Sequence, residues 1–324
     1  MPDVVTFGEA MLRLSPPGRL RLEQARTLEV WPAGAELNVA VGLSRLGEDV
    51  AWISRLPASP LGEIVLAHAR SFGIDVSGVL RAEEGRLGLY FVEVSEPPLA
   101  SRALYDRSAS DFALLDPGEL DWEVLLAGAR AFHVTGITPA LSDGCARAAA
   151  DALRAARAAR CATSYDLNLR TRLAPPGDWR ARLEEVAPSL DTLVCSCEDA
   201  AVVLGVEGPP ADVAGRLRDL LGIERVVASR RVADGVALRR ESAAADGDGT
   251  VGATSPPFRA SEPVGAGDAF CAGLLSGLLA GDLARGLELG GAMAAVKQAV
   301  PGDAPVVGLE ELELALAEDP RMRR

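Results

Sequence analysis

Short apolar runs alternate along the chain with longer segments whose apolar residues repeat at helical spacing. Strands are predicted at residues 4–8, 50–54, 76–81, 131–137, 161–169, 192–197 and 225–229. Helices are predicted at residues 35–46, 61–72, 121–129, 141–158, 180–186, 198–204 and 211–221. Regular alternation of strands and helices is typical of a parallel sheet with helices on its faces. The pattern therefore predicts an α/β fold with a mostly parallel central sheet flanked by helices.

The alternation is interrupted where two apolar runs follow each other without a helix between them. Residues 87–94 and 102–107 are predicted to be strands joined by a turn through Pro97 and Pro98. Such a hairpin would form a small separate sheet on the main body, and a flap over a bound ligand is its expected use. We therefore expect a small β-sheet lid.

The last third of the chain returns to strands and then ends in helices. A strand is predicted at residues 236–240, a loop of small residues at 243–249, a connecting segment at 251–258, and helices at 268–280, 282–299 and 308–316. Neither an internal repeat nor a long linker divides the sequence. We therefore predict a single domain over residues 1–324, with a lid subdomain from about residues 10–32 and 86–110.

Composition narrows the classes of function. Of the 324 residues, 48% are hydrophobic, which is enough to bury a large core. The formal net charge of −13 argues against a general nucleic-acid or anionic-membrane surface. The apolar stretches are shorter than the ~20 residues that a membrane span needs. The five cysteines lack paired spacing and the chain starts without a signal segment, so we expect a reducing, cytoplasmic location.

A stretch near the end of the chain carries the strongest chemical signal. In Ser-Glu-Pro-Val-Gly-Ala-Gly-Asp-Ala-Phe, residues 261–270, small residues directly precede Asp268 and an apolar run. At a helix N-terminus, uncovered N–H groups and the helix dipole together form a site for a phosphate or a developing negative charge. Asp268 is then placed to accept a proton from a hydroxyl that attacks this anion. Aspartate is also a favoured helix cap, so a purely structural role stays open at this point.

Polar residues recur where the predicted strands end. They are Asp166, Asn168 and Arg170 after one strand, and Ser196, Glu198 and Asp199 after the next. Ligands bind at the carboxyl ends of strands in open parallel sheets, and this group of acceptors with few donors suits a magnesium-bound phosphate chain. Asn38 lies in a predicted helix that is apolar on nearly all faces, so its amide needs either backbone partners or a ligand hydroxyl.

Two motifs at opposite ends of the chain resemble the signatures of the PfkB (ribokinase-like) sugar kinases. Pro-Ala-Gly-Ala-Glu-Leu-Asn-Val-Ala at residues 32–40 is similar to the N-terminal signature, and Val-Gly-Ala-Gly-Asp-Ala-Phe at 264–270 to the C-terminal one. Within the family, Tyr-Asp-Arg at 105–107, Asp-Leu-Asn-Leu-Arg at 166–170 and Lys-Gln-Ala-Val-Pro-Gly-Asp at 297–303 look most like the 2-keto-3-deoxygluconate kinases. The resemblance spans essentially the whole chain and implies a ribokinase-like fold.

The resemblance implies roles for individual residues. Asp268 would take the proton from the sugar hydroxyl, while the N–H groups of Gly265, Ala266 and Gly267 hold the γ-phosphoryl group. Substrate contacts are implied for Gly34, Asn38, Tyr90, Tyr105, Arg107 and Arg170. Nucleotide contacts are implied for Asn168, Ser196, Ser229, Gly235 and Gly267, and magnesium contacts through water for Glu198 and Asp199. The implied cofactors are ATP and Mg²⁺, with K⁺ as a further cation that the resemblance allows.

The implied substrate is a small sugar or sugar acid, and the expected reaction converts 2-keto-3-deoxygluconate to its 6-phosphate. Arg107 and Arg170 suit a sugar acid, because a guanidinium group recognises a carboxylate through two parallel bonds. A kinase for a neutral sugar, such as fructose or ribose, is the alternative without this carboxylate. In many members of the family the lid pairs two subunits, which implies a homodimer through the lid or a higher homo-oligomer.

Four positions depart from the family pattern. Ala33 stands where the first signature has a glycine, and Glu262 and Pro263 stand where the second begins with Asp-Thr. Ser-Cys-Glu-Asp at residues 196–199 replaces an Asn-x-x-Glu magnesium motif, and Val232 replaces a glycine that lies near the nucleotide. These departures leave open a second class of function, a catalytically impaired homologue that binds a sugar acid or a nucleotide and acts as a sensor.

Overall fold

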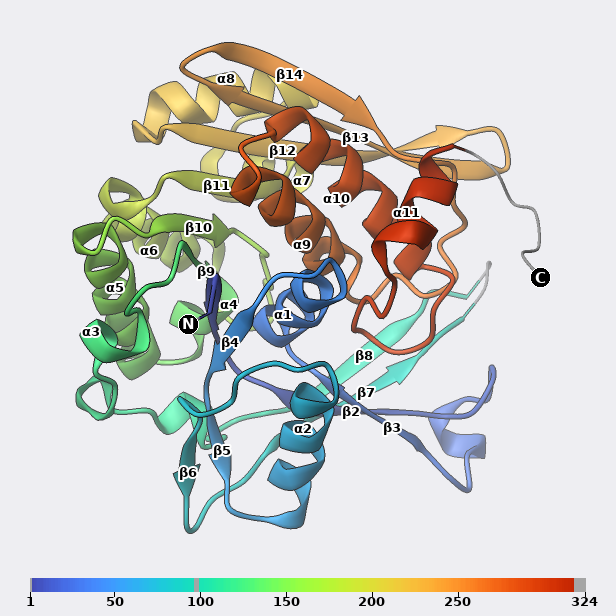
Figure 1. Ribbon diagram of the computed structural model, residues 1–324. Coiled ribbons are helices and arrows are strands. Elements are labelled where there is room, and N and C mark those ends of the chain that lie inside the picture. The colour runs from blue at the N-terminus through green and yellow to red at the C-terminus, as the bar shows by residue number, and fades with distance from the viewer. Residues whose placement is uncertain (1, 96–98, 318–324) are drawn as a thin grey trace.

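The computed structural model describes residues 2–95 and 99–317, and an eight-stranded main sheet runs through its centre (Figure 1). In spatial order its strands are β14 (Gly249–Thr254), β13 (Ala237–Asp246), β12 (Arg225–Asp234), β11 (Thr192–Ser196), β10 (Ala162–Asp166), β9 (Ala131–Thr135), β1 (Val4–Phe7) and β4 (Val50–Ile53). The strands from β12 to β4 in this order are parallel, whereas β13 pairs antiparallel with both of its neighbours, β12 and β14. The predicted α/β fold with a mostly parallel central sheet is confirmed.

Helices cover both faces of this sheet. On one face the core lies under α5 (Asp143–Ala158), α6 (Pro176–Val186), α7 (Cys197–Leu204) and α8 (Pro210–Leu221). On the other it lies under α1 (Ala35–Arg45), α2 (Pro60–Ser71), α9 (Ala266–Leu279), α10 (Leu283–Lys297) and α11 (Leu309–Leu316). Successive strand residues point to opposite faces, so Val226 and Ala228 of β12 enter the first core and Val227 enters the second. Among the helices of the described residues, none is both long and apolar enough to cross a bilayer.

A four-stranded small sheet lies apart from the main sheet, at the lower right of Figure 1. Its strands, in order, are β3 (Glu29–Ala33), β2 (Met11–Ser15), β7 (Gly88–Glu93) and β8 (Arg102–Asp106). The predicted hairpin is therefore present as β7 and β8, while its turn through Pro97 and Pro98 lies outside the described residues. Two further strands, β5 (Arg55–Pro57) and β6 (Leu80–Ala82), pair only with each other in a third sheet.

The predicted loop at residues 243–249 is wrong, because β13 continues through most of it. Ala243, Ala244 and Ala245 are buried and pair with β12 on one side and β14 on the other, which satisfies their backbone N–H and C=O groups. Their small side chains lie where α8 and α10 approach the sheet from its two faces. A run of small residues is typical of a loop, whereas here it allows helices to pack closely on a strand.

Other boundaries also differ from the predictions. The strand expected at residues 76–81 is limited to β6, which does not join the main sheet. The helix expected at 141–158 is interrupted at Ser142, so that a short α4 (Ile137–Leu141) precedes α5. Ser142 has extended backbone angles, and its Oγ accepts a bond of 3.1 Å from the N–H of Cys145 as the cap of the new helix.

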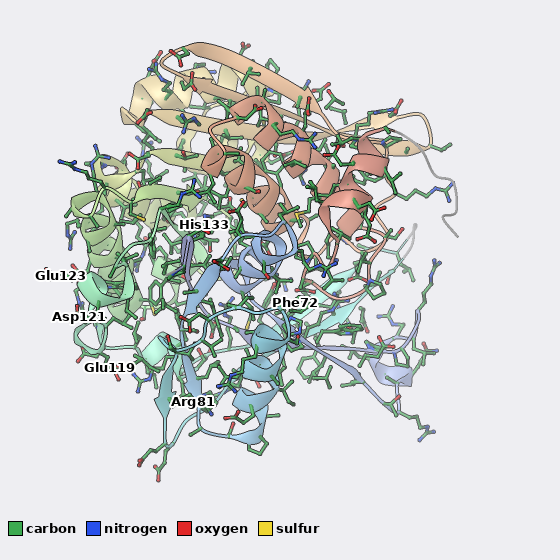
Figure 2. The ribbon with its side chains drawn as sticks, viewed as in Figure 1. Phe72, Arg81, Glu119, Asp121, Glu123 and His133 are labelled. Carbon is green, nitrogen blue, oxygen red and sulfur yellow. The ribbon has the colours of Figure 1, made fainter. Side chains whose placement is uncertain are left out.

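The helix expected at residues 121–129 is only one turn long, α3 (Trp122–Leu125). Beyond it the chain makes turns with i to i−3 bonds, such as Ala129 N–H to Leu126 O at 3.0 Å, and then enters β9. Figure 2 shows Glu119, Asp121 and Glu123 around α3 on the outer surface. Acidic residues in this position contribute to the negative net charge without affecting the core. Single 3₁₀ turns occur at Leu22–Gln24, Phe112–Leu114, Pro117–Glu119 and Ala187–Ser189.

Candidate active site

A polar cleft of about 530 Å³ lies at the carboxyl ends of β10, β11 and β12, against the N-terminus of α9. This is the edge at which parallel sheets bind their ligands. The site residues predicted from the sequence that line it are Tyr105, Asn168, Arg170, Ser196, Glu198, Asp199, Ser229, Gly265, Ala266, Gly267 and Asp268. The other predicted residues, Gly34, Asn38, Tyr90, Arg107 and Gly235, do not line it.

The N-terminus of α9 forms one wall of the cleft, and it begins at Ala266, two residues before the predicted start. Gly265 caps the helix with a positive φ of 81°, and an added Cβ there would lie 1.9 Å from the backbone oxygen of Asp303. The first turn of an α-helix offers N–H groups that the helix itself does not use. Gly267 adds no side chain over them, because its position faces open space. The wall therefore presents backbone donors to an anion.

Asp268 projects from this first turn and is held by two amide side chains. Its Oδ2 accepts a 2.7 Å bond from Asn38 Nδ2, and its Oδ1 accepts a longer one, 3.4 Å, from Asn168 Nδ2. Burial raises the pKa of the Asp268 carboxyl, while these amides and the nearby guanidinium of Arg170 act in the opposite direction. A buried carboxylate held by neutral donors is oriented and is also a stronger base than an exposed one.

Asn38 therefore reaches the cleft through Asp268. It lies one turn into α1, and its Oδ1 is a buried acceptor without a hydrogen-bond partner among the described residues. Gly34 caps the same helix, and a Cβ there would lie 2.3 Å from the backbone oxygen of Glu9. The glycine therefore allows the N-terminus of α1 to pack against the segment that follows β1. That packing accounts for Gly34 structurally, and its contact with a substrate stays a prediction.

Three aspartates share the floor of the cleft. Asp166 at the end of β10, Asp199 in α7 and Asp268 line it together. Burial, followed by repulsion from Asp268 and Asp199, raises the pKa of Asp166 to about 7. The described residues contain no group of three or more histidine, cysteine or acidic side chains arranged to hold a metal ion. The floor therefore attracts a cation, which would take its remaining ligands from a bound phosphate chain and water.

The opposite wall carries arginines that the sequence reasoning did not assign to the site. Arg231 and Arg240 line the cleft, and Arg240 Nη1 donates a 2.8 Å bond to Ser229 Oγ. The guanidinium of Arg240 also lies 5.5 Å from the ring centre of Phe270, and burial lowers its pKa. Arg240 faces the cleft because β13 pairs with β12 in one register, which the local sequence does not reveal. These cations face the place where phosphate groups would lie.

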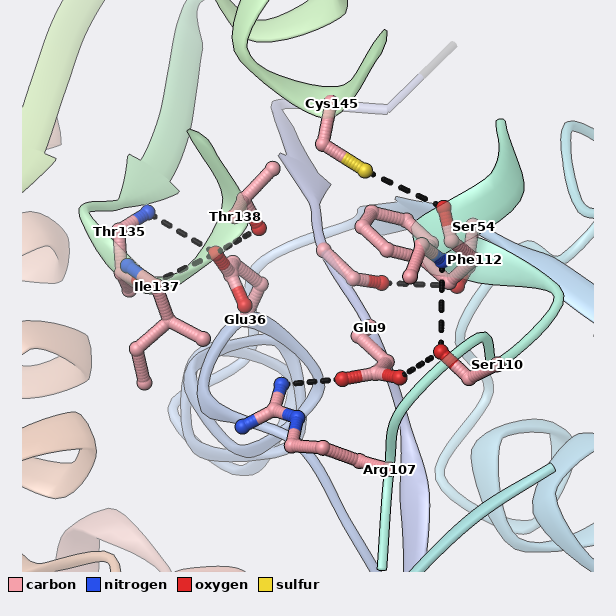
Figure 3. Close-up of polar contacts among 12 residues, drawn as sticks. Glu9, Glu36, Ser54, Arg107, Ser110, Phe112, Thr135, Ile137, Thr138 and Cys145 are labelled. Carbon is pink, nitrogen blue, oxygen red and sulfur yellow. Dashed lines mark hydrogen bonds and ion pairs between the residues drawn. The ribbon is translucent and has the colours of Figure 1, made fainter. Parts of the chain in front are cut away.

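The two arginines predicted to hold a substrate carboxylate lie in different surroundings. Arg107 forms an ion pair with Glu9, whose other carboxylate oxygen accepts a bond from Ser110 Oγ (Figure 3). The side chains of this pair are 12% and 2% exposed, so Arg107 is already engaged inside the protein. Arg170 is exposed and lines the cleft. Within the described part of the chain, its Nη1 donates to the backbone oxygens of Leu169 at 2.9 Å and Asn168 at 3.5 Å.

Tyr90 and Tyr105 connect the small sheet with the cleft. Their rings stack with centres 5.5 Å apart, and Tyr105 lines the cleft whereas Tyr90 is buried and donates its hydroxyl to Asp303. Tyr90 therefore supports Tyr105 from behind. Gly235 lies in the exposed turn between β12 and β13, and its contact with a nucleotide stays a prediction.

A second, mainly apolar groove of about 780 Å³ adjoins the cleft. It lies between the segment after β14 and the helices α10 and α11, and Gln298 lines both spaces. Its walls include Pro256, Pro257, Val296 and Ala299. Such walls suit a flat apolar ring rather than a phosphate.

Comparison with known proteins gives one consistent result. The model of the family described as pfkB family carbohydrate kinase matches residues 1–306. The chain is 38% identical over 317 residues to 2-dehydro-3-deoxygalactonokinase of Haloferax volcanii, which covers 97% of this chain and 96% of that protein. It is 31% identical to 2-dehydro-3-deoxygluconokinase of Thermoproteus tenax, over 94% of this chain and 90% of the relative. The crystal structure of 2-dehydro-3-deoxygluconokinase from Thermotoga maritima superposes with a TM-score of 0.91 at 32% identity, covering 97% and 98% of the two chains.

Proposed function

The chain belongs to the pfkB family of carbohydrate kinases, and from this premise we propose that it phosphorylates a 2-keto-3-deoxy sugar acid with ATP. The substrate is 2-keto-3-deoxygluconate or its epimer 2-keto-3-deoxygalactonate, the compounds named for the relatives above, and the acceptor is the 6-hydroxyl. One observation carries the proposal. A buried carboxylate, Asp268, is held by two amides beside the first-turn N–H groups of α9, of which that of Ala266 makes a long bond of 3.4 Å to the Pro263 oxygen.

The chemical step follows from this geometry. Asp268 accepts the proton as the sugar oxygen forms a bond to the γ-phosphorus, and the bond from that phosphorus to the β-phosphate oxygen breaks to release ADP. The N–H groups at the start of α9 hold the γ-phosphoryl oxygens, on which charge is concentrated during transfer. Asn38 and Asn168 keep the Asp268 carboxylate aimed at the acceptor hydroxyl.

The nucleotide fits the two adjoining spaces. Its phosphates lie in the cleft against Arg231 and Arg240, and its base lies in the apolar groove beyond Gln298. When Mg²⁺ is bound with the nucleotide, it neutralises part of the phosphate charge. Asp166, Asp199 and Glu198 fit this ion because they place carboxylates on the cleft floor, where they act through water rather than as a preformed metal site.

The substrate carboxylate binds to Arg170 rather than equally to both predicted arginines. Arg170 is exposed in the cleft, whereas the charge of Arg107 is already balanced by Glu9. Arg170→Ala is expected to raise KM for the sugar acid by about 10–100-fold, the typical value for a bond to a charged group. Arg107→Ala is the matched comparison, and its main expected effect is on stability. An unchanged KM in Arg170→Ala, measured by initial rates, would show that the carboxylate lies elsewhere.

We further propose that two copies associate through the small sheet, which acts as the lid over the cleft. Its edge strand β8 exposes Leu104, and the opposite edge strand β3 exposes Val30. Leu104→Glu should shift a dimer to monomer in light scattering coupled to gel filtration.

The five cysteines are free and buried, which supports a reducing cytoplasm. The resemblance allows K⁺, but we propose that no free monovalent cation takes part, because the buried ammonium group of Lys297 already bonds the backbone oxygen of Glu262 in the loop before α9.

A substrate panel tests the proposed function. Purified protein with MgATP is assayed for ADP release in the presence of each of the two sugar acids, fructose and ribose. We expect kcat/KM for a sugar acid to exceed that for either neutral sugar by at least about 100-fold, or ~2.7 kcal/mol. Tight sugar-acid binding without ADP release would instead support an impaired, ligand-binding homologue. Faster turnover of fructose or ribose would assign the protein to neutral sugars.

A further inference from the structure

Lys297 is the only lysine in the chain. The sequence has 33 lysine and arginine residues, and all the others are arginine. This lysine has a relative exposure of 0% and is the last residue of α10. A single lysine in a chain that otherwise uses arginine, placed in the interior, indicates a position where the shape of an ammonium group matters.

The ammonium group joins two segments that enclose the anion site. Lys297 Nζ donates to the backbone oxygen of Glu262 at 3.3 Å and to that of Val300 at 3.2 Å. Glu262 lies three residues before Gly265, the cap of α9, and Val300 belongs to the turn that leads to Asp303. The backbone oxygen of Asp303 packs directly against Gly265. Lys297 therefore ties the loop before the anion site to the turn that supports it from behind.

The charges behind the anion site balance only if Lys297 is protonated. Arg13 Nη1 bonds the carboxylates of Glu262 and Asp303 at 2.6 and 2.7 Å, and those two acidic groups attract the Lys297 ammonium as well. With one cation removed, a net negative charge would lie behind N–H groups that must bind phosphate. A positive charge here is therefore needed for anion binding in the front of the loop.

A lysine fits this place better than an arginine. The two acceptors are backbone oxygens, and a compact ammonium group binds them as a monovalent metal cation would. The planar guanidinium group is larger and has five donors in a fixed arrangement, which two carbonyls cannot satisfy. The C-terminal end of α10 also carries the negative end of the helix dipole, which favours a cation at its last residue.

We propose that Lys297 is a positioning residue of the kinase reaction, a built-in cation that holds the phosphate-binding loop in place and makes a free monovalent cation unnecessary. This inference rests on the proposed function, because it assigns Lys297 a part in binding the γ-phosphoryl group. The groups that face the ammonium are Glu262, Asp303, Arg13 and, at longer range, Asp268. The carboxylates of Glu262, Asp303 and Asp268 keep Lys297 charged at neutral pH, although burial and, to a smaller extent, the charge of Arg13 lower its pKa to about 8.

The charge of Lys297 can be measured directly because it is the only lysine. In wild-type protein labelled with ¹³C-lysine, one Cε resonance reports the titration, without any assignment by mutation and without turnover. We expect a midpoint near pH 8, well below the ~10.4 of an exposed lysine. A midpoint below 7 would overturn the proposal, because the working enzyme would then hold a neutral amine at this place.

Substitution tests the role in the reaction. Wild type should have the same kcat in potassium, sodium and choline chloride, and Lys297→Met should lower kcat by about 10–100-fold and weaken ATP binding. In Lys297→Ala, added NH₄⁺ or K⁺ should restore at least several-fold of the lost rate. Arg285→Met, which removes one partly exposed, ion-paired positive charge from the start of the same helix, is the control and should stay near wild type.

Two kinetic results would also refute the role of Lys297. They are a wild-type enzyme that is inactive without K⁺, and a Lys297→Met variant with unchanged kcat and unchanged ATP affinity. Failure of the proposed function is distinguishable from both. If wild type turns over neither sugar acid, ATP affinity measured by calorimetry and the lysine titration still decide whether this cation supports the phosphate-binding loop.

Discussion

The loop that starts α9 separates two groups of acidic side chains with opposite surroundings. In front, facing the cleft, Asp268 is bonded to the neutral amides of Asn38 and Asn168. Behind it, Asp303 is bonded to Arg13 and Tyr90. The front group lacks a bonded cation among the described residues, whereas the rear group is ion-paired.

This difference separates reactivity from support. Burial without a bonded cation raises the pKa of Asp268 and Asp166. The ionised form of each carboxylate is therefore less stable than in water, and its affinity for a proton or Mg²⁺ is higher. The rear acids have their charge balanced by Arg13 and Lys297, which fixes the loop without competing for the phosphate. Acidic side chains therefore take part in the reaction on the cleft side of the loop and stabilise the loop on its other side.

The largest expected effect on the cleft side of the loop is that of Asp268→Asn. An amide cannot accept the proton of the acceptor hydroxyl, so kcat should fall by about 10²–10⁴-fold while ATP affinity stays within about threefold of wild type. Initial rates and calorimetry measure the two quantities. Retention of most of the kcat would remove Asp268 from the role of base.

On the other side of the loop, Arg13→Met removes the ion pairs with Glu262 and Asp303. The side chain of Arg13 is 3% exposed, and the substitution leaves the buried carboxylate of Asp303 and the partly buried one of Glu262 without this partner. We expect the free energy of unfolding to fall by about 3–5 kcal/mol, as for other broken buried pairs. Urea unfolding followed by circular dichroism measures it. Arg130→Met removes an exposed pair and should cost less than about 1 kcal/mol, so equal losses in the two variants would contradict the comparison.

The difference between the two groups also predicts that one substitution, Asp166→Asn, stabilises the folded protein and slows its reaction. The pKa of Asp166 is raised to about 7 in the folded state, against ~3.9 in an unfolded chain. The folded state therefore binds more protons between these values, and this residue lowers the free energy of unfolding as pH rises through that window. Asp166→Asn should stabilise the protein by about 1–3 kcal/mol at pH 8 and have little effect near pH 4.

Urea unfolding at the two pH values checks this prediction, with the exposed Asp151→Asn as the control for loss of one negative charge. The same Asp166→Asn protein should turn over more slowly at limiting Mg²⁺, because a carboxylate is missing from the cleft floor. Equal stability of wild type and Asp166→Asn at pH 8 would show that the charge of Asp166 is compensated after all.

The parts of this arrangement that were predictable are those encoded by neighbouring residues. The order of strands and helices follows from local apolar patterns, and the small residues before Asp268 indicated the helix N-terminus directly. Partners distant along the chain were not predictable. Arg13 meets Asp303, and Glu9 engages Arg107, only after the small sheet packs on the main body. Arg240 faces the cleft because of the β12–β13 register, so its role required the structure.

The smallest and most specific test concerns Asn38, which links the front side to α1. Its 2.7 Å bond to Asp268 favours the charged carboxylate, so Asn38→Ala should raise the pKa of that carboxyl further. Because the reaction needs the unprotonated form, the acid limb of kcat against pH should move to higher pH, with a fall of about tenfold at pH 7. Asn168→Ala removes a 3.4 Å contact and should shift the limb less. A larger shift for Asn168→Ala would mean that the longer contact, not the shorter one, sets the basicity of Asp268.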